Sequence, residues 1–386
     1  MNPDAITEDA PGEVELADGA WTYNPDPLPP DIEPDHELTR LHSEAEFGLG
    51  KLNNVEAWLD DPQIVLSPLI HKEAADSSDI ETISRVTVED IYLQEAGESP
   101  ARNAKEMQDF IEAANYVKSI RAGMERLENG QIIDVDLICE LHGILLGGVR
   151  GESKNPGKFR DNIVGVDEEG TSVSEARFVP MAPAKIPWAL ERLLEYVRTG
   201  GTYPDLMDIA LIHYQFETIH PFRDGNGRVG RLLIMLILHE WGKLPGPYLY
   251  PSAYFNANKE EYYQRLLSVN RGGAWREWVE FFLTAIVSQS KEAFSLAREL
   301  NDLREKYERQ YDGRGPVIQE LVDYVVEQPF FSEPQAAEAI GRSQPAVNKA
   351  IHELWDDGVI IETTGKETHR RYRAEEVMRI LAPYTS

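Results

Sequence analysis

Apolar residues recur three or four positions apart along most of this chain, which is the period of a helix with one buried face. The pattern is clear at Ile111, Tyr116, Val117 and Ile120. It predicts helices over 132–146, 187–197 and 207–218, a helix that ends near 241, and helices over 260–270 and 275–311. One β-hairpin is predicted in the middle of the chain, between about 156 and 180. We therefore expect a mainly α fold, a helical bundle with a single β-hairpin.

The pattern changes after Gly315, where shorter apolar segments predict a small separate domain. Helices are expected over 317–326, 332–340 and 344–357, followed by two strands, 359–362 and 370–372. The strands can pair across Gly365 and Lys366. Three helices and a two-stranded wing are typical of a winged helix-turn-helix domain, whose third helix enters the major groove in DNA-binding members.

The third helix of this domain offers Gln344, Asn348 and Lys349 as candidate contacts to DNA. Four further basic residues would lie near phosphates: Arg342, Lys366, Arg370 and Arg371. Glu353 and Asp356 lie on the same helix and would repel the phosphate backbone. A protein partner is therefore favoured over DNA for this domain, and both stay open.

The first 34 residues are acidic and rich in proline, and their apolar residues show no regular spacing. We expect residues 1–34 to form an irregular arm. The remaining chain divides at changes in pattern into an N-terminal helical region (35–100), a central bundle (101–300), and a helical connector with the C-terminal domain (301–386).

Composition excludes several kinds of ligand and cross-link for this protein and indicates where it is located. The 386 residues carry a formal net charge of −29, which repels nucleic acid at long range and favours solubility. Cys139 is the only cysteine, so the chain can form neither an intrachain disulfide nor a cysteine-based zinc site. The acidic arm has no basic, apolar leader, and the longest apolar run, Leu232–Leu238, is far too short to cross a membrane. We expect a cytoplasmic protein that does not bind membranes.

A dense group of charged residues and glycines stands just before that apolar run, between His220 and Arg231. Gly225 and Gly227 let the N–H groups of a loop that opens a helix approach an anion, and the helix dipole favours that charge. Arg228 and Arg231 are three positions apart and can reach the same phosphate with forked contacts. This pattern predicts a phosphate-binding loop.

Two further side chains of the loop suit phosphate chemistry. Asp224 is a carboxylate that can hold Mg²⁺, a cation commonly bound by one or two carboxylates and the phosphates of a substrate. His220 can accept a proton, because the unperturbed pKa of histidine lies near neutral pH. Upstream, His213 and Glu217 are four positions apart, and we expect them to be buried supports rather than metal ligands.

The stretch resembles, at every fixed position, the signature of the Fic family, His-x-Phe-x-(Asp or Glu)-Gly-Asn-Gly-Arg-x-x-Arg. Fic enzymes transfer AMP from ATP to a hydroxyl group of a target protein, and their helical fold carries a hairpin called the flap. The resemblance implies that His220 deprotonates the attacking Ser, Thr or Tyr hydroxyl and that Asp224 positions Mg²⁺. It also implies that the rest of the loop holds the nucleotide phosphates, with Arg231 on the terminal one: Gly225, Asn226, Gly227, Arg228, Val229, Gly230 and Arg231.

Ser77 and Glu81 resemble the inhibitory motif of Fic proteins, Ser/Thr-x-x-x-Glu followed by Gly or Asn, although Thr82 stands at that last position. The two residues are one helical turn apart and would share a face. The resemblance implies that Glu81 pairs with Arg231 and keeps the terminal phosphate out of a productive position. The alternative is an ordinary helix N-cap, because Ser or Asp followed by Glu is a common capping pattern.

Segments on either side of the signature resemble further Fic landmarks. The flap, which aligns the backbone of the target by strand addition, corresponds to a segment that includes Ile163, Val164 and Gly165. The adenine pocket corresponds to Tyr262, Tyr263 and Asn270. Aromatic rings can cover an adenine face, but ordinary helix packing explains the two tyrosines about as well.

The resemblance implies an autoinhibited protein adenylyltransferase that uses ATP and Mg²⁺ and also modifies itself when the Glu81 contact loosens. The same site could run backwards, with Glu81 orienting a water that removes AMP from a modified protein. An alternative from a different class of function is a DNA-binding regulator whose Fic core senses a nucleotide. An intact His220 favours retained chemistry, because a sensor needs no base. The sequence identifies neither the target protein nor whether the chain forms a homodimer.

Overall fold

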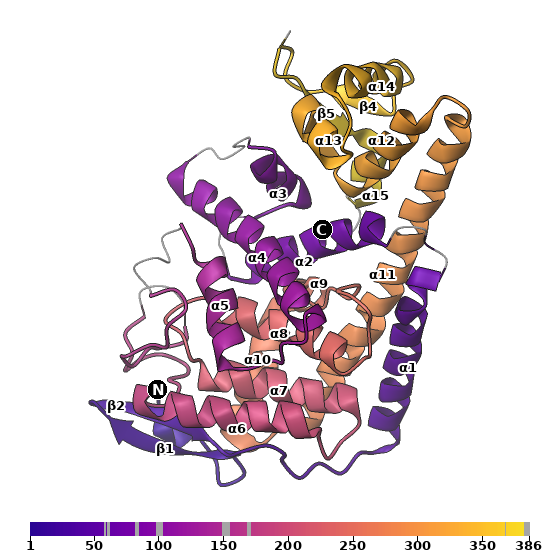
Figure 1. The fold of residues 1–386 in the computed structure, drawn as a ribbon. Helices are drawn as coiled ribbons and strands as arrows, with labels where there is room; N and C mark the ends of the chain where they lie inside the picture. The colour runs from indigo at the N-terminus through magenta and orange to yellow at the C-terminus, as the bar shows by residue number, and fades with distance from the viewer. Residues whose placement is uncertain are drawn as a thin grey trace. The chain divides into compact units, whose positions relative to one another are not determined.

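The computed structural model describes residues 1–57, 59, 62–81, 85–97, 103–148, 155–167, 171–366 and 368–381. Helices make up most of these residues, as predicted for a mainly α fold (Figure 1). The chain divides into two compact units. The first unit contains residues 1–50, 118–246 and 254–289, and the second contains 51–117, 247–253 and 290–386.

The framework helices are α1 (His36–Asn53), α2 (Gln63–Glu81), α3 (Val88–Glu95), α4 (Ala104–Glu128), α5 (Val135–Leu145), α6 (Ile186–Thr199), α7 (Asp205–Ile219), α8 (Asn226–Glu240), α9 (Ser252–Ala257), α10 (Lys259–Gly272) and α11 (Trp275–Gln310). Where the apolar pattern predicted the bounds of a helix, the observed ends agree to within a few residues: α5, α6, α7, the end of α8, α10 and α11. Within the described residues, no helix is both long enough and apolar enough to cross a membrane.

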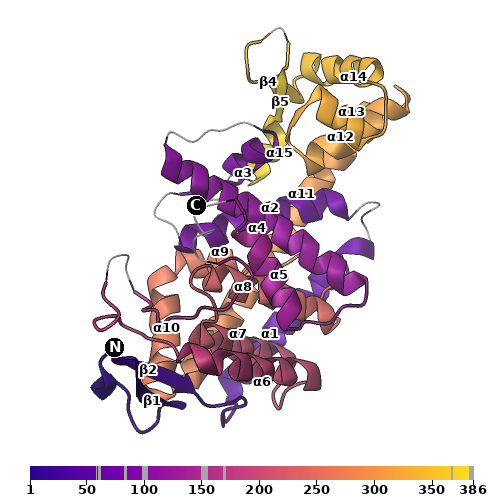
Figure 2. The same ribbon diagram turned by 60° about the vertical axis from the view of Figure 1, so that its left-hand side comes forward.

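The helices α7 and α8 lie side by side in the first unit and pack against each other (Figure 2). Both are buried along most of their length. Gly230 permits their close approach, because a Cβ atom there would lie 2.3 Å from Oε1 of Glu217 and 3.1 Å from Cδ1 of Phe216. Trp278 of α11 joins this core and donates its indole N–H to the Ala210 carbonyl at 2.9 Å. The packing fixes both ends of the loop that joins α7 to α8, which carries the signature.

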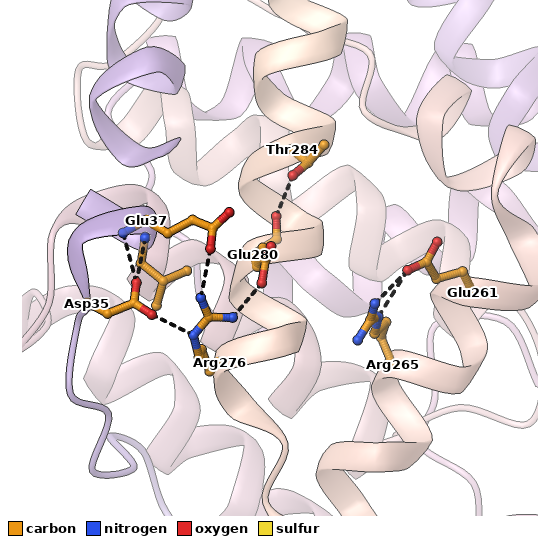
Figure 3. A network of polar contacts seen from close by, with 8 residues as sticks. Asp35, Glu37, Glu261, Arg265, Arg276, Glu280 and Thr284 are labelled. Atoms are coloured by element: carbon orange, nitrogen blue, oxygen red, sulfur yellow. Dashed lines mark hydrogen bonds and ion pairs between the residues drawn. The ribbon is translucent and has the colours of Figure 1, made fainter. Parts of the chain in front are cut away.

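A cluster of charges around Arg276 holds the start of α1 against α11 (Figure 3). The guanidinium donates to Asp35 at 2.7 Å, to Glu280 at 2.6 Å and to Glu37 at 3.2 Å. Asp35 also caps α1, because its Oδ1 accepts the N–H of Leu38 at 2.9 Å. Exposed ion pairs of this kind stabilise a fold little, so we assign the cluster mainly to fixing where α1 begins.

The N-terminal segment contains a β-hairpin, so the expectation of an irregular arm is wrong. The strands β1 (Gly12–Ala17) and β2 (Ala20–Pro25) pair antiparallel across the turn Asp18–Gly19. Both turn residues have positive φ, 47° and 81°, and Asp-Gly is a preferred pair for such a two-residue turn. Tyr23 is fully buried and donates its N–H to the Val179 carbonyl at 2.9 Å. The short alternating pattern was hidden among acidic residues and prolines.

The hairpin predicted between 156 and 180 is reduced, among the described residues there, to a single bridge between Val166 and Phe178. The Asp167 carboxylate accepts the backbone N–H of Arg177 at 2.7 Å and its Nε at 2.9 Å. These bonds join the two sides of the segment next to the bridge. The three predicted flap residues precede the bridge and lie outside the strands of the described chain: Ile163, Val164 and Gly165.

In the second unit, α2 packs against α3 and α12 (Pro316–Glu327). The following elements have the predicted order, with α13 (Glu333–Ala339), α14 (Gln344–Asp356), β4 (Ile360–Glu362) and β5 (Arg371–Ala374). The helix α15 (Glu375–Leu381) comes after them and was not predicted. The predicted pairing of the last two strands is confirmed. A three-residue strand that the pattern did not indicate, β3 (Phe330–Ser332), pairs with the other edge of β5 and completes an antiparallel sheet in the order β3-β5-β4.

Candidate active site

His220 ends α7 in a left-handed conformation, with φ 51° and ψ 62°. This conformation costs a non-glycine residue about 1–2 kcal/mol, and it turns the chain sharply out of the helix. The N–H of His220 still donates to the Phe216 carbonyl at 3.0 Å and closes the last turn of α7. The candidate base therefore sits at a strained corner whose position is set by the end of a buried helix.

The imidazole of His220 is oriented by the same turn. Its Nδ1 lies 3.2 Å from the carbonyl oxygen of Glu217. A proton on Nδ1 makes this contact a hydrogen bond and leaves Nε2 as the basic nitrogen, which is the tautomer that a general base needs. The side chain is half-buried, so the ring is not enclosed in the core.

The loop closes at Gly225, which has φ 77° and directly precedes α8. A side chain at this φ would be strained, and a Cβ atom would also lie 3.4 Å from the Leu145 side chain. The first N–H groups of a helix have no acceptor within the helix, and they carry the positive end of its dipole. The start of α8 is therefore suited to hold an anion, as predicted for Gly225 and Gly227.

Asn226 gives the loop its shape. Its side chain is buried, its Oδ1 accepts the N–H of Phe222 at 2.8 Å, and its Nδ2 donates to the Phe222 carbonyl at 2.9 Å. These two bonds use the side-chain amide within the loop itself. A contact of Asn226 with phosphates therefore stays a prediction, and its backbone N–H is the group suited to it.

His142 of α5 braces the same loop and was not identified from the sequence. Its Nδ1 accepts the N–H of Gly157 at 2.8 Å, so the proton of the neutral ring lies on Nε2, 3.0 Å from the Asp224 carbonyl. The ring stacks on Phe222 with 3.7 Å between centroids. Burial lowers the pKa of His142 to about 4, so the ring is neutral at neutral pH. A single histidine on the buried face of a helix looks like any core histidine in the sequence.

Arg228 and Arg231 bring two guanidinium groups into the first turns of α8. Arg231 is fully buried, and Arg228 is nearly so, with its Nη2 3.7 Å from Oδ1 of Asp224. Two buried positive charges beside a helix N-terminus favour a polyanion such as a triphosphate. Val229 donates its N–H to the Gly225 carbonyl at 3.1 Å, and Gly230 packs on α7. Phosphate contacts of these two residues stay predictions.

Asp224 is the residue that fits a Mg²⁺ ion. Its side chain is 46% exposed, and Oδ1 accepts the N–H of Gly225 at 2.7 Å. No group of three His, Cys, Asp or Glu side chains that could hold a metal occurs within the described part of the chain. One carboxylate beside a phosphate loop is nevertheless a donor set that Mg²⁺ accepts, because waters and substrate phosphates supply its other ligands.

Tyr262 lies inside the core of the first unit. Its hydroxyl is 2.8 Å from Nε2 of His213, and its ring packs on Phe255 with 4.9 Å between centroids. Burial lowers the pKa of His213 to about 3, so this histidine is neutral. The predicted role of His213 as a buried support is confirmed.

Asn270 is also buried, and its Oδ1 accepts the hydroxyl groups of Tyr214 and Thr218, the latter at 3.3 Å. These bonds connect α10 to α7. Tyr263 is half-buried, next to the ring of Tyr262. An adenine contact stays a prediction for all three predicted residues, and Tyr263 is the one of them that is not buried.

The predicted inhibitory residues lie at the C-terminal end of α2. Ser77 is fully buried, and Glu81 is the exposed last residue of the helix. The alternative interpretation as a helix N-cap is wrong, because this helix begins far upstream, at Gln63. Thr82 lies outside the described residues. The pairing of Glu81 with Arg231 stays a prediction.

Family models match the chain in two places. The model described as Fic/DOC family matches residues 132–238, which include the signature loop, and the model described as Fic/DOC family N-terminal matches residues 39–125, which include the α2 motif. Two relatives are protein adenylyltransferases by name. A probable protein adenylyltransferase of Aquifex aeolicus is 36% identical over 85 residues, and this alignment covers 22% of this chain and 27% of that protein. The protein adenylyltransferase fic-1 of Caenorhabditis elegans is 27% identical over 175 residues, 45% of this chain and 31% of that protein. The alignments therefore span less than a third of either relative.

A solved structure shares the fold over most of the chain. The crystal structure of a Fic family protein from Desulfovibrio desulfuricans covers 90% of this chain and 98% of that chain, with a TM-score of 0.58 and 22% sequence identity. At this identity the likeness concerns the fold alone. The family models match both the segment with the signature loop and the segment with the α2 motif, and the common fold agrees with them: the chain belongs to the Fic/DOC family.

Proposed function

We propose that this chain is an autoinhibited protein adenylyltransferase, which transfers AMP from ATP to a Ser, Thr or Tyr hydroxyl of a target protein. The protein adenylyltransferases among its relatives support this activity. One observation of the site gives the main support for AMP transfer. The left-handed corner at His220 lies five residues before Gly225, which directly precedes α8, and two buried arginines follow in the first turns of that helix.

The chemistry follows from this geometry. The target hydroxyl loses its proton to Nε2 of His220 while its oxygen bonds to the α-phosphorus of ATP. The bond from that phosphorus to the bridging oxygen breaks, and pyrophosphate leaves. The N–H groups at the start of α8 and the charges of Arg228 and Arg231 stabilise the negative charge on the phosphates. The protein thus contributes positioning, a base and electrostatic stabilisation.

Asp224 would hold Mg²⁺, which when bound neutralises part of the phosphate charge. Its carboxylate accepts the Gly225 N–H and is exposed beside the loop, so it can bind an ion there. We assign no other residue of the described chain to the metal.

Autoinhibition is assigned to Glu81. A glutamate that occupies Arg231 would prevent the terminal phosphate from binding productively, and release of that pairing would permit transfer, including transfer to the chain itself. The exposed position of Glu81 at the very end of α2 supports this assignment, because the end of a helix can change its contacts without unfolding the core. Removal of AMP by the same site stays an alternative.

The Glu81→Gly chain, incubated with α-labelled ATP and Mg²⁺, is expected to incorporate about 10-fold or more label than the wild type, within the usual range of coupling energies. The matched control is Glu128→Gly, because Glu128 is likewise the exposed last residue of a helix, α4. Label in the control should equal that of the wild type. Equal labelling of the wild type and the Glu81→Gly chain would contradict autoinhibition by Glu81.

We propose further that the C-terminal elements form a winged helix-turn-helix domain that contacts protein rather than DNA. Three of the side chains expected near DNA already have partners within the domain. Asn348 donates to Glu333, Arg342 donates to Glu320 at 2.7 Å, and Arg370 lies over the Trp355 ring at 5.3 Å. DNA binding would have to replace these contacts against a strongly acidic chain.

The full chain is therefore expected to give no sequence-specific gel shift. At physiological salt, retardation should begin only at the concentrations of non-specific binding, with Kd about 10⁻⁴–10⁻⁶ M or weaker. A salt-sensitive complex with one particular duplex, lost on Lys349→Ala, would favour the DNA-binding regulator instead.

A further inference from the structure

Arg160 is a buried arginine that contacts backbone carbonyls. Its side chain donates from Nε to the His220 carbonyl at 2.8 Å and from Nη1 to the Asn162 carbonyl at 3.2 Å. Nη2 donates to the carbonyls of Met181 and Ile219, at 2.6 and 3.4 Å. The residue is only 2% exposed. Burial lowers the pKa of Arg160 to about 10, so the group stays charged at neutral pH.

Two of these carbonyls belong to the C-terminus of α7. The last carbonyls of a helix have no donor within the helix, and they carry the negative end of its dipole. A buried guanidinium supplies both the missing donors and a positive charge to Ile219 and His220. The backbone N–H of Arg160 also donates to the Pro221 carbonyl at 2.9 Å. Arg160 thus bonds three successive carbonyls around the left-handed corner.

The other two carbonyls lie on either side of residues 163–180, the part of the predicted flap that follows Arg160. Asn162 directly precedes this part and Met181 directly follows it, and the same guanidinium bonds both. Arginine suits this junction because its planar fork holds five donors in fixed, diverging directions. Lysine has a single ammonium on a flexible stem and cannot reach all four carbonyls at once.

We propose that Arg160 is a positioning residue for the transfer reaction: it sets the corner that aims the His220 imidazole, and it ties that corner to both ends of the segment 162–181. The contact between Nδ1 of His220 and the Glu217 carbonyl depends on the same stretch of backbone. This inference rests on the proposed function, since it gives Arg160 its effect through His220 as the base.

The test compares the Glu81→Gly chain with the same chain carrying Arg160→Lys or Arg160→Gln. The control is Arg192→Lys, which changes an exposed arginine of α6 that pairs with the neighbouring Glu195. The measurements are kcat and KM for ATP with α-labelled ATP, the melting temperature, and the NMR signals of the His220 imidazole, assigned by their loss in His220→Ala. His36 serves as the reference signal, because it is exposed at the start of α1.

We expect Arg160→Lys to melt near its parent, to keep the KM for ATP, and to lose about 100-fold in kcat, the order of effect of a misplaced catalytic group. The His220 signals should shift, and the His36 signals should not. Unchanged kcat and unchanged His220 signals would overturn the proposal, as would unfolding of both Arg160 variants, which would make Arg160 a general support. If the parent transfers no AMP, the proposed function fails, whereas a selective shift of the His220 signals would still support the positioning role.

Discussion

Replacing His220 by alanine in the Glu81→Gly chain is expected to lower the rate of AMP transfer by about 100- to 10,000-fold, the usual contribution of a general base. The methyl group that remains cannot take the proton of the attacking hydroxyl. The phosphate loop itself should persist, because Asn226, His142 and Gly225 hold it without the imidazole. Affinity for ATP should therefore change little, and the loss should appear in kcat.

The rate is measured with α-labelled ATP under single-turnover conditions, and nucleotide binding is measured separately by calorimetry. The control is His36→Ala, which removes an exposed imidazole from the start of α1. A His220→Ala chain that keeps most of the parent rate would show that another group accepts the proton. A chain that loses ATP affinity and rate together would give His220 a role in the shape of the loop instead.

Replacing Glu73 by alanine is expected to destabilise the second unit by about 3 kcal/mol or more, because three buried donors lose their acceptor at about 1–3 kcal/mol each. Glu73 is 1% exposed in the middle of α2. Its carboxylate accepts the Tyr116 hydroxyl at 3.1 Å, the Ser252 N–H at 3.0 Å, and the Ser252 hydroxyl. One side chain thus joins α2 to α4 and to the start of α9.

The loss of stability is measured as the fall in melting temperature, with Glu44→Ala as the control. Glu44 is an exposed carboxylate that is paired with Arg40, and its removal should lower the free energy of unfolding by at most about 0.5 kcal/mol. Glu73→Gln keeps the shape but replaces one acceptor by a donor, so it should fall between the two. Because Glu81 ends the same helix, a loosened α2 should also raise labelling with Glu81 in place. Equal melting of Glu73→Ala and Glu44→Ala would contradict an anchoring role.

The parts of the site predicted correctly are those that several neighbouring residues encode together. The positions between His220 and Arg231 combine glycines, arginines and an apolar run, and the structure has the expected turn and helix start there. Gly225 was identifiable because a left-handed turn before a helix favours glycine. The long helices followed from their apolar period, which many residues share.

The parts that were missed depend on single residues or short runs. Arg160 and His142 act on backbone groups distant in sequence, and nothing beside them marks that role. The sequence did not decide whether Tyr262 lines a pocket or belongs to the core, because a large aromatic residue on a helix fits both places. The hairpin β1–β2 had only a short alternating pattern and the turn Asp18–Gly19 as signals, in a segment whose composition indicated an irregular arm.

Transfer of AMP rather than of the terminal phosphate is tested most directly by giving the Glu81→Gly chain ATP that is labelled at either its α- or its γ-phosphate. The double variant with Glu81→Gly and His220→Ala is treated in parallel. We predict that the protein takes up label from the α position, takes up none from the γ position, and loses the α label when His220 is absent. Uptake of γ label, or equal α label with and without His220, would contradict a site in which His220 and the start of α8 direct a hydroxyl to the α-phosphorus.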